Sequence, residues 1–329
     1  MTITEEKIRS TQGQFVELQQ ELGKIIVGHH NVIQGTLMAL LCGGNVLLEG
    51  VPGLGKTLIV RTLSKTLSLS FSRIQFTPDL MPADIIGTNL VMEDENGRRF
   101  FEFAPGPIFA HLILADEINR ATPKTQAALL EAMQERSVTV GKQSYQLEEP
   151  FGVLATQNPI EMEGTYPLPE AQVDRFFFKL YLNPPNGDEL KEIIRRNTGM
   201  GKAHQLSTSV TREQLLEARE IVESFPIAEP LVEYASRLIL STHPDEQSSP
   251  DLVKKYVAYG ASPRAGISLV AGAKAHAFLN GATNVRTEDL KAVFPMALTH
   301  RVLLNFKAQS EGITVDQILE HALKQVKEI

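Results

Sequence analysis

The chain has 329 residues, of which 43% are apolar and 22% charged, and its formal net charge is −7. This length permits two domains with cores of their own, and the composition is that of an ordinary globular protein. The acidic balance argues against a large nucleic-acid-binding surface, and the single cysteine, Cys42, excludes an intramolecular disulfide and a cysteine-rich metal site.

Nothing in the sequence indicates a membrane span or a secretion signal. No apolar run is long enough to cross a bilayer, and the first ten residues, MTITEEKIRS, are acidic and polar. We therefore expect a cytoplasmic protein with no membrane span.

The first sixty-odd residues predict two helices, a strand and a third helix. Apolar residues repeat at helical spacing over 4–26 and again over about 31–42. The short apolar run NVLLE, residues 45–49, has the length of a strand, and a further helical repeat covers 58–67. The glycine-rich segment 50–57 therefore joins a strand to a helix.

This segment fits the pattern GxxxxGK[ST] of a phosphate-binding loop. Glycines let backbone N–H groups converge on an anion, and the N-terminus of the next helix adds partial positive charge. Lys56 would reach the β- and γ-phosphates of a nucleotide, and the Thr57 hydroxyl would ligate Mg²⁺. We expect the nucleotide to contact Gly50, Val51, Pro52, Gly53, Leu54, Gly55, Lys56, Thr57 and Leu58.

A second strand leads to a pair of acidic residues. Residues 112–115 read as a buried strand that ends in Asp116-Glu117, and ligands of an open parallel sheet bind beyond the carboxyl ends of its strands. Asp116 would hold Mg²⁺ through water, and Glu117 would orient and polarise the attacking water. The plain alternative is an acidic pair that only caps a loop.

Two β-hairpins are predicted within the first domain. Apolar runs flank Asn96-Gly97 in the segment of about 88–104, which is a hairpin signal. The segment of about 136–149 turns at Gly141-Lys142 and would place two valines opposite two apolar residues of the returning strand: Val138 and Val140 opposite Tyr145 and Leu147.

The chain after the sequence NPPNG, residues 183–187, reads as helical. Later helices are expected over about 264–280, 287–304 and 314–327. We therefore predict an α/β domain over 1–183, a linker over 184–187 and a helical lid over 188–329, with the nucleotide in the crevice between the two domains.

Arg264 lies in the first turn of one of these helices, after Ser262 and Pro263, which suit the N-cap and first positions. A cation there opposes the helix dipole, so another group should stabilise it. A nucleotide phosphate is the obvious candidate.

Five motifs now stand in a characteristic order: GVPGLGKT, LILADEINRATPKTQAALLEAMQE, ATQNP, YPLPEAQVDRF and ASPRAG. With them the chain resembles the MoxR group of the AAA+ ATPases from about Ile26 to about Leu304. The resemblance implies a P-loop AAA+ core with a parallel sheet flanked by helices, a C-terminal all-helical lid, and hydrolysis of ATP to ADP with Mg²⁺. It also implies adenine recognition near Val27 and Gly28, although His29 stands where similar proteins usually carry glutamine.

The resemblance also implies roles for three polar residues. Asn158 matches the sensor-1 position, where an amide contacts the γ-phosphate or the attacking water; its alternative is a turn residue before Pro159. Arg175 matches the arginine finger that reaches the nucleotide of the next subunit. The alternative for Arg175 is a surface salt bridge with one of two neighbouring carboxylates, Glu170 or Asp174.

The roles of two further arginines are left open by the sequence. Arg264 matches the sensor-2 arginine, and the sequence leaves open whether it would act on the nucleotide of its own subunit or of a neighbour. Arg120 would either face a subunit interface or form a structural salt bridge.

The two hairpins resemble the helix-2 insert and the pre-sensor-1 hairpin of the clade that includes MoxR, magnesium chelatase and the replicative MCM helicases. Such hairpins often line a central pore and touch the client, or alternatively only pack against neighbouring subunits. The resemblance implies a ring, expected to be a hexamer, that acts as a chaperone on a protein client. Its partner would carry a von Willebrand factor A domain.

Three other functions stay open at this point. The first is a magnesium-chelatase-like motor subunit, and the second is a nucleic-acid-remodelling ATPase. The third is a nucleotide-dependent scaffold whose catalysis is vestigial, against which the intact Lys56, Asp116 and Glu117 argue.

Overall fold

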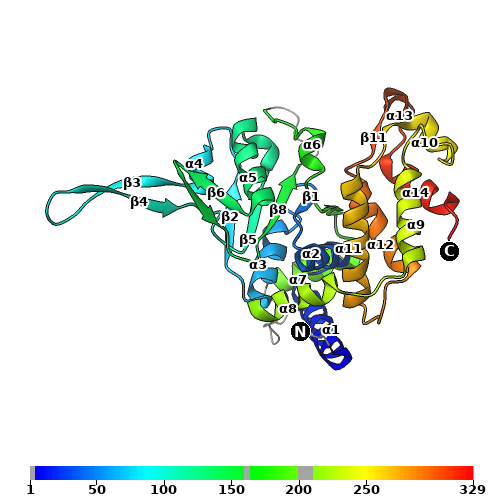
Figure 1. Ribbon diagram of the computed structural model, residues 1–329, viewed down its shortest axis with the longest axis horizontal. Coiled ribbons are helices and arrows are strands. Elements are labelled where there is room, and N and C mark those ends of the chain that lie inside the picture. The colour runs from blue at the N-terminus through cyan, green and yellow to red at the C-terminus, as the bar shows by residue number, and fades with distance from the viewer. Residues whose placement is uncertain (1–3, 159–163, 199–209, 329) are drawn as a thin grey trace.

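The structure, a computed structural model, describes residues 4–158, 164–198 and 210–328. It has an α/β part built on a central sheet and a helical part packed beside it, seen at the left and right of Figure 1. None of the described helices is long and apolar enough to cross a membrane.

The central sheet has five parallel strands in the order β2-β5-β8-β1-β9. Because all five run the same way, their carboxyl ends share one edge and their amino ends the other. We call these the carboxyl edge and the amino edge. The strands are β1 (Val46–Glu49), β2 (Phe71–Gln75), β5 (Leu112–Asp116), β8 (Gly152–Gln157) and β9 (Phe178–Tyr181).

Helices cover both faces of this sheet, as predicted. Val46 and Leu48 of β1 point into one apolar core and Leu47 into another, which is the alternation expected of a strand. The first core lies under α1 (Glu5–Ile25), α2 (His30–Leu41) and α3 (Lys56–Thr66). The second lies under α4 (Pro82–Ile86), the 3-10 turn η1 (Ile118–Arg120) and α5 (Pro123–Glu135).

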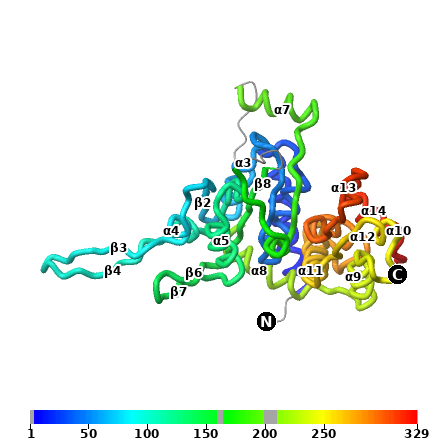
Figure 2. The backbone as a smooth tube through the Cα atoms, turned by 90° about the horizontal axis from the view of Figure 1, so that it is seen from above, coloured from blue at the N-terminus to red at the C-terminus, as the bar shows by residue number. Residues whose placement is uncertain are grey.

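Both predicted hairpins are present, and both project from the body (Figures 1 and 2). They touch where the ring of Phe103 stacks on that of Tyr145, with 3.9 Å between centroids. Their strands are β3 (Gly87–Glu93), β4 (Arg99–Pro105), β6 (Ser137–Val140) and β7 (Gln143–Gln146).

The predicted pairing within the second hairpin is partly wrong. Val138 does lie opposite Tyr145, but Val140 pairs with Gln143. The reason is the two-residue turn at Gly141-Lys142, where Gly141 has a φ of 65°. This turn joins Val140 directly to Gln143, so these two residues form the last pair of the hairpin.

The C-terminal part is the predicted helical lid. Its apolar core is continuous with the first core of the sheet, since Leu48 of β1 and Phe278 of α11 belong to one buried cluster. The helices that follow β9 along the chain are α7 (Gly187–Asn197), α8 (Arg212–Glu223), α9 (Glu229–Leu240), α10 (Asp251–Tyr256), α11 (Pro263–Leu279), α12 (Thr287–Leu298), α13 (Phe306–Glu311) and α14 (Val315–Gln325).

The helix predicted over 287–304 ends earlier, at Leu298. His300 and Arg301 turn toward the sheet, where their side chains hydrogen-bond the backbone of Phe176, and this draws the chain out of the helix. The next residues form β11 (Leu303–Leu304), which pairs with β10 (Val257–Tyr259) in a short sheet that the sequence patterns did not predict.

Candidate active site

The phosphate-loop segment, residues 50–57, lies at the carboxyl edge between β1 and α3. Gly53 and Gly55 have φ angles of 86° and 79°, and a Cβ added to either would meet nothing within 4 Å. The loop backbone therefore borders open space, as a phosphate cradle requires. The Lys56 Nζ donates to the Gly50 carbonyl at 2.5 Å, which folds the lysine back over the loop.

Lys56 is almost fully buried, and burial lowers the pKa of its ammonium group. The carboxylates of Asp116 and Glu117 act in the opposite direction and raise that pKa. The structure thus brings the loop lysine and the acidic pair together, although they are sixty residues apart in the sequence.

Asp116 is the last residue of β5 and is 9% exposed. Its Oδ1 accepts from the Thr156 hydroxyl at 2.7 Å, and its Oδ2 accepts from the Arg73 guanidinium at 2.6 Å. A buried carboxylate at this edge, close to the lysine of the loop, fits a Mg²⁺ ion that is held directly or through water.

Glu117 has left-handed backbone angles, φ 57° and ψ 50°, which are unfavourable for a residue other than glycine by roughly 1–2 kcal/mol. The Thr156 hydroxyl compensates by accepting the Glu117 backbone N–H at 2.8 Å. The carboxylate accepts from Gln75 Nε2 at 2.9 Å and from Arg120 Nη1 at 3.0 Å. Of the two alternatives for Arg120, the structure shows the salt bridge.

Asn158 directly follows β8 at the same edge and is buried. Pro159, the residue on which its turn interpretation depended, lies outside the described residues. The carboxyl edge therefore gathers the phosphate loop, the acidic pair and this amide.

The expected adenine region, Val27 and Gly28, lies beside the phosphate loop and α7. A Cβ on Gly28 would meet the carboxylate of Glu189 at 2.8 Å. Burial lowers the pKa of the neighbouring His29 imidazole, while Glu189 and the backbone of Leu54 raise it. His29 thus lies between the phosphate loop and α7.

Arg175 and Arg264 lie at the opposite, amino edge of the sheet. Both line a cavity of about 370 Å³ together with residues 43–45, which precede β1. The four residues of β1 lie between this cavity and the phosphate loop, and at about 3.3 Å each they span about 13 Å. Neither arginine is near the loop of its own chain.

We call this the arginine cavity, because four arginines and one carboxylate line it, which leaves three formal positive charges. Arg175 is exposed, and within the described chain no carboxylate lies at ion-pairing distance from it, so the predicted alternative of a salt bridge with Glu170 or Asp174 is not observed. The five charged lining residues are Arg136, Asp174, Arg175, Arg264 and Arg301.

Asp174 instead joins the sheet to the lid. It accepts hydrogen bonds from the Ser262 hydroxyl at 2.8 Å, from Arg264 Nη1 at 3.2 Å and from Arg301 Nε at 2.9 Å. Burial alone would raise the pKa of the Asp174 carboxyl, but the hydrogen bonds from Ser262 and Arg301 hold it below its ordinary value. The cation at the start of α11 is therefore stabilised by a carboxylate of the same chain.

Sequence reasoning missed four residues of these sites: Arg73, Gln75, Thr156 and Asp174. The first two alternate along β2 and reach the acidic pair from the neighbouring strand. A signal for them was present, because polar residues at every second position are unusual in a strand of a parallel sheet.

Comparison with known protein families supports this geometry. Residues 45–178 match the model described as the ATPase family associated with various cellular activities (AAA), and residues 250–322 match an AAA lid domain. The first match runs from the residue before β1 to the first residue of β9, so it covers four of the five strands of the central sheet completely.

Similar proteins cover almost the entire chain. Chaperone MoxR1 of Mycobacterium tuberculosis is 44% identical over 93% of this chain and 80% of its own length. Protein MoxR of Methylorubrum extorquens is 31% identical over 87% of this chain and 86% of its own length. A crystal structure of a candidate ATPase from Cytophaga hutchinsonii has a TM-score of 0.90 at 44% identity, covering 98% of this chain and 97% of that one.

Proposed function

The chain belongs to the MoxR family of AAA ATPases, and we propose that it hydrolyses ATP at sites that are each completed by two copies of the chain. The observation that carries this proposal is the separation of the two half-sites. The phosphate loop and the acidic pair lie at the carboxyl edge, and the exposed Arg175 lies at the amino edge.

The carboxyl edge would bind and activate the substrate. Lys56 and the backbone of the loop would hold the ATP phosphates, and Thr57 and Asp116 would hold Mg²⁺. The ion, when bound, neutralises charge on the β- and γ-phosphates. Glu117 would accept a hydrogen bond from the attacking water and orient it, and Asn158 would contact that water or the γ-phosphate.

The amino edge would serve the neighbouring copy. Arg175 and Arg264 would meet the phosphates bound at the next copy's loop, where a planar cation offsets the charge that develops during transfer. Because both lie on the far side of β1 from their own loop, the geometry favours action of Arg264 on a neighbour's nucleotide. One copy uses two different surfaces, so the assembly is head-to-tail and closes as a ring, which we take to be a hexamer.

We assign residues 1–183 to the nucleotide-binding core, 184–187 to a linker and 188–329 to the lid. Hydrolysis would change the angle between core and lid and would move the hairpins at 88–104 and 136–149. The exposed apolar residues of the first hairpin, among them Val91 at 62% and Phe101 at 76% exposure, suit contact with an unfolded client. We further propose that this chaperone works with a partner that has a von Willebrand factor A domain.

The test is the rate of ATP hydrolysis per chain, measured with Mg²⁺ as the protein concentration is raised. We expect the rate to climb and then level off as copies assemble, and Arg175→Ala to lower the plateau by about three orders of magnitude. A flat rate that is independent of Arg175 would contradict shared sites.

A further inference from the structure

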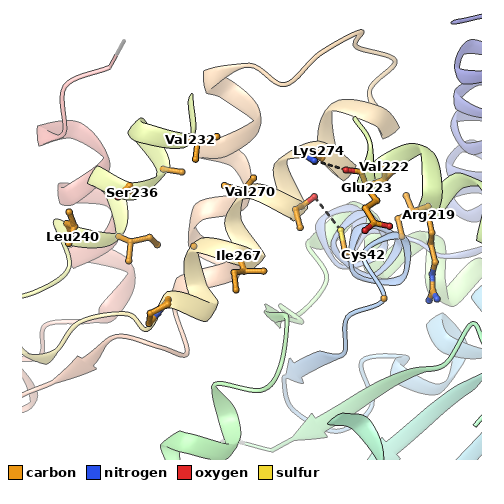
Figure 3. A pocket seen from close by; sticks show the side chains of 17 residues that line it. Cys42, Arg219, Val222, Glu223, Val232, Ser236, Leu240, Ile267, Val270 and Lys274 are labelled. Atoms are coloured by element: carbon orange, nitrogen blue, oxygen red, sulfur yellow. Dashed lines mark hydrogen bonds between the residues drawn. The ribbon is translucent and has the colours of Figure 1, made fainter. Parts of the chain in front are cut away.

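A groove lies in the lid next to the arginine cavity. It has a volume of about 880 Å³ and runs between α8, α9 and α11, with the end of α2 beneath it (Figure 3). Its lining is mainly aliphatic and includes Val222, Val232, Ile267 and Val270, while charged side chains stand at one end. We call it the lid groove.

The lid groove and the arginine cavity form one continuous surface. Ile267, one turn after Arg264 on α11, lines both of them and is 68% exposed. An exposed isoleucine over an aliphatic groove is an unfavourable surface in water, and such patches commonly mark interaction sites. Any molecule that reaches Arg264 from outside would also lie against this groove.

A second uncovered apolar surface lies at the other half-site. Helix α7 has no buried residue, and Leu190 and Ile194, four residues apart and therefore on one face, are 47% and 49% exposed. Figure 2 shows this helix standing out from the body beside α3. A helix of eleven residues is marginal without a packed apolar face, so this face calls for a partner.

The opposite face of α7 fixes the helix beside the nucleotide site of its own chain. Arg196 Nη1 donates to the carbonyl of Lys24 at 2.5 Å, at the end of α1. Near its other end, Glu189 packs against Gly28 in the expected adenine region. The pair Leu190 and Ile194 thus faces outward from the rim of the phosphate site.

The two apolar surfaces lie on the same side of the sheet. The lid groove belongs to the side of α1, α2 and α3, because the end of α2 forms part of it, and α7 contacts the end of α1. Copies in a ring differ by a rotation about the ring axis, so this side is shared around the ring. With the arginine cavity of one copy at the phosphate loop of the next, the groove and α7 would lie on the same side of that interface.

We propose that Leu190 and Ile194 of α7 dock in the lid groove of the neighbouring copy, beside the shared nucleotide. This inference rests on the proposed function, because it requires the head-to-tail ring. It adds a contact between the lid of one copy and the adenine side of the next, so that the angle of one lid bears on its neighbour's nucleotide pocket.

A disulfide trap tests the contact. In a Cys42→Ser background, Leu190→Cys and Ile267→Cys are placed in one chain, which is assembled with ADP and Mg²⁺ and oxidised. We expect a ladder of covalent multimers on a non-reducing gel. The matched control replaces Ile267→Cys by Tyr259→Cys, which is equally exposed at 70% but lies outside the groove, and should give no ladder.

Light scattering on the same samples measures assembly, so it shows whether a missing ladder reflects absent docking or absent assembly. Assembly without the ladder, with Ile267→Cys still open to a thiol reagent, would overturn the docking and leave the shared-site ATPase standing. No assembly at any concentration would overturn both proposals.

A second pair of variants gives the size of the effect. Leu190→Asp with Ile194→Asp should weaken assembly about a hundredfold, because two aliphatic side chains lose their burial. The affinity of the single chain for fluorescent ADP should stay within twofold, since neither residue faces the nucleotide. Unchanged assembly in this variant would contradict the docking.

Discussion

The two edges of the central sheet have opposite chemistry. The carboxyl edge presents an open glycine loop, a buried lysine and two carboxylates, whereas the amino edge presents four arginines around one carboxylate. Among the described residues, the carboxyl edge has the phosphate loop and the carboxylates but no arginine like Arg175, and the amino edge has the arginines but no phosphate loop. Under the proposed function these are the two halves of one site on separate copies of the chain, so we expect ATP hydrolysis to require assembly.

The strongest test of whether the two edges form one active site across an interface is to mix two inactive variants. Glu117→Gln should lower hydrolysis by about two to four orders of magnitude through loss of the base, and Arg175→Ala by a similar factor. An assembly formed by one variant alone lacks either Glu117 or Arg175 at every site. In a one-to-one mixture about one site in four has both halves intact, so activity should return.

The control for this mixture is Glu117→Gln combined with a Glu117→Gln, Arg175→Ala double variant, in which no interface is complete. ATPase rates at a fixed total concentration give the comparison. Failure of the first mixture to exceed the control would mean that the two residues do not meet across an interface. Full ATPase activity of Glu117→Gln alone would instead mean that Glu117 does not orient the attacking water.

A substitution of Asp174 tests the amino edge from the structural side, because Asp174 is the carboxylate that lines the arginine cavity. Asp174→Ala would leave the Arg301 side chain, which is 2% exposed, without its carboxylate partner, and we expect the free energy of unfolding to fall by about 3 kcal/mol. Urea unfolding measures it.

The matched control is Glu320→Ala, which breaks an exposed ion pair with Lys324 and should lower the free energy of unfolding far less, because solvent screens that pair. Equal losses in the two variants would mean that Asp174 does not hold the lid to the sheet.

The sequence predicted the carboxyl edge far better than the amino edge. The phosphate loop and Asn158 directly follow a strand and Asp116 ends one, and in a parallel sheet this local position decides which edge they occupy. Glycine spacing and apolar runs are local patterns, so they could be read without knowing the fold.

The amino edge depends on contacts between distant segments. Asp174 meets Arg301 across 127 residues and Ser262 across 88, and no spacing rule predicts such pairs. The same contacts explain the wrong end of the helix predicted over 287–304: the apolar pattern continues through Leu304, but Arg301 must turn to the sheet. Arg73 and Gln75 were missed because their partners belong to the neighbouring strand.

The smallest expected effect is a pH dependence of the folding stability, which arises from a histidine at the amino edge. His300 lies beside Arg301 at the amino edge, and its Nε2 bonds the carbonyl of Phe176 at 3.0 Å. Burial and the Arg301 charge lower the pKa of the His300 imidazole to about 3. Between this value and the ordinary value of about 6.5 the unfolded chain binds a proton that the folded chain does not, so folding stability falls as pH drops.

At pH 5 the loss relative to pH 7 should be about 2 kcal/mol, since each pH unit below 6.5 contributes about 1.4 kcal/mol. His300→Gln keeps a donor to Phe176 and removes the titration, so its unfolding free energy, followed by urea titration at pH 7, 6 and 5, should vary less with pH by that amount. Parallel curves for the two proteins would show that the imidazole is protonated in the folded state. The amino edge would then tolerate an additional positive charge, and its arginines would be less dependent on a neighbour's phosphates than we infer.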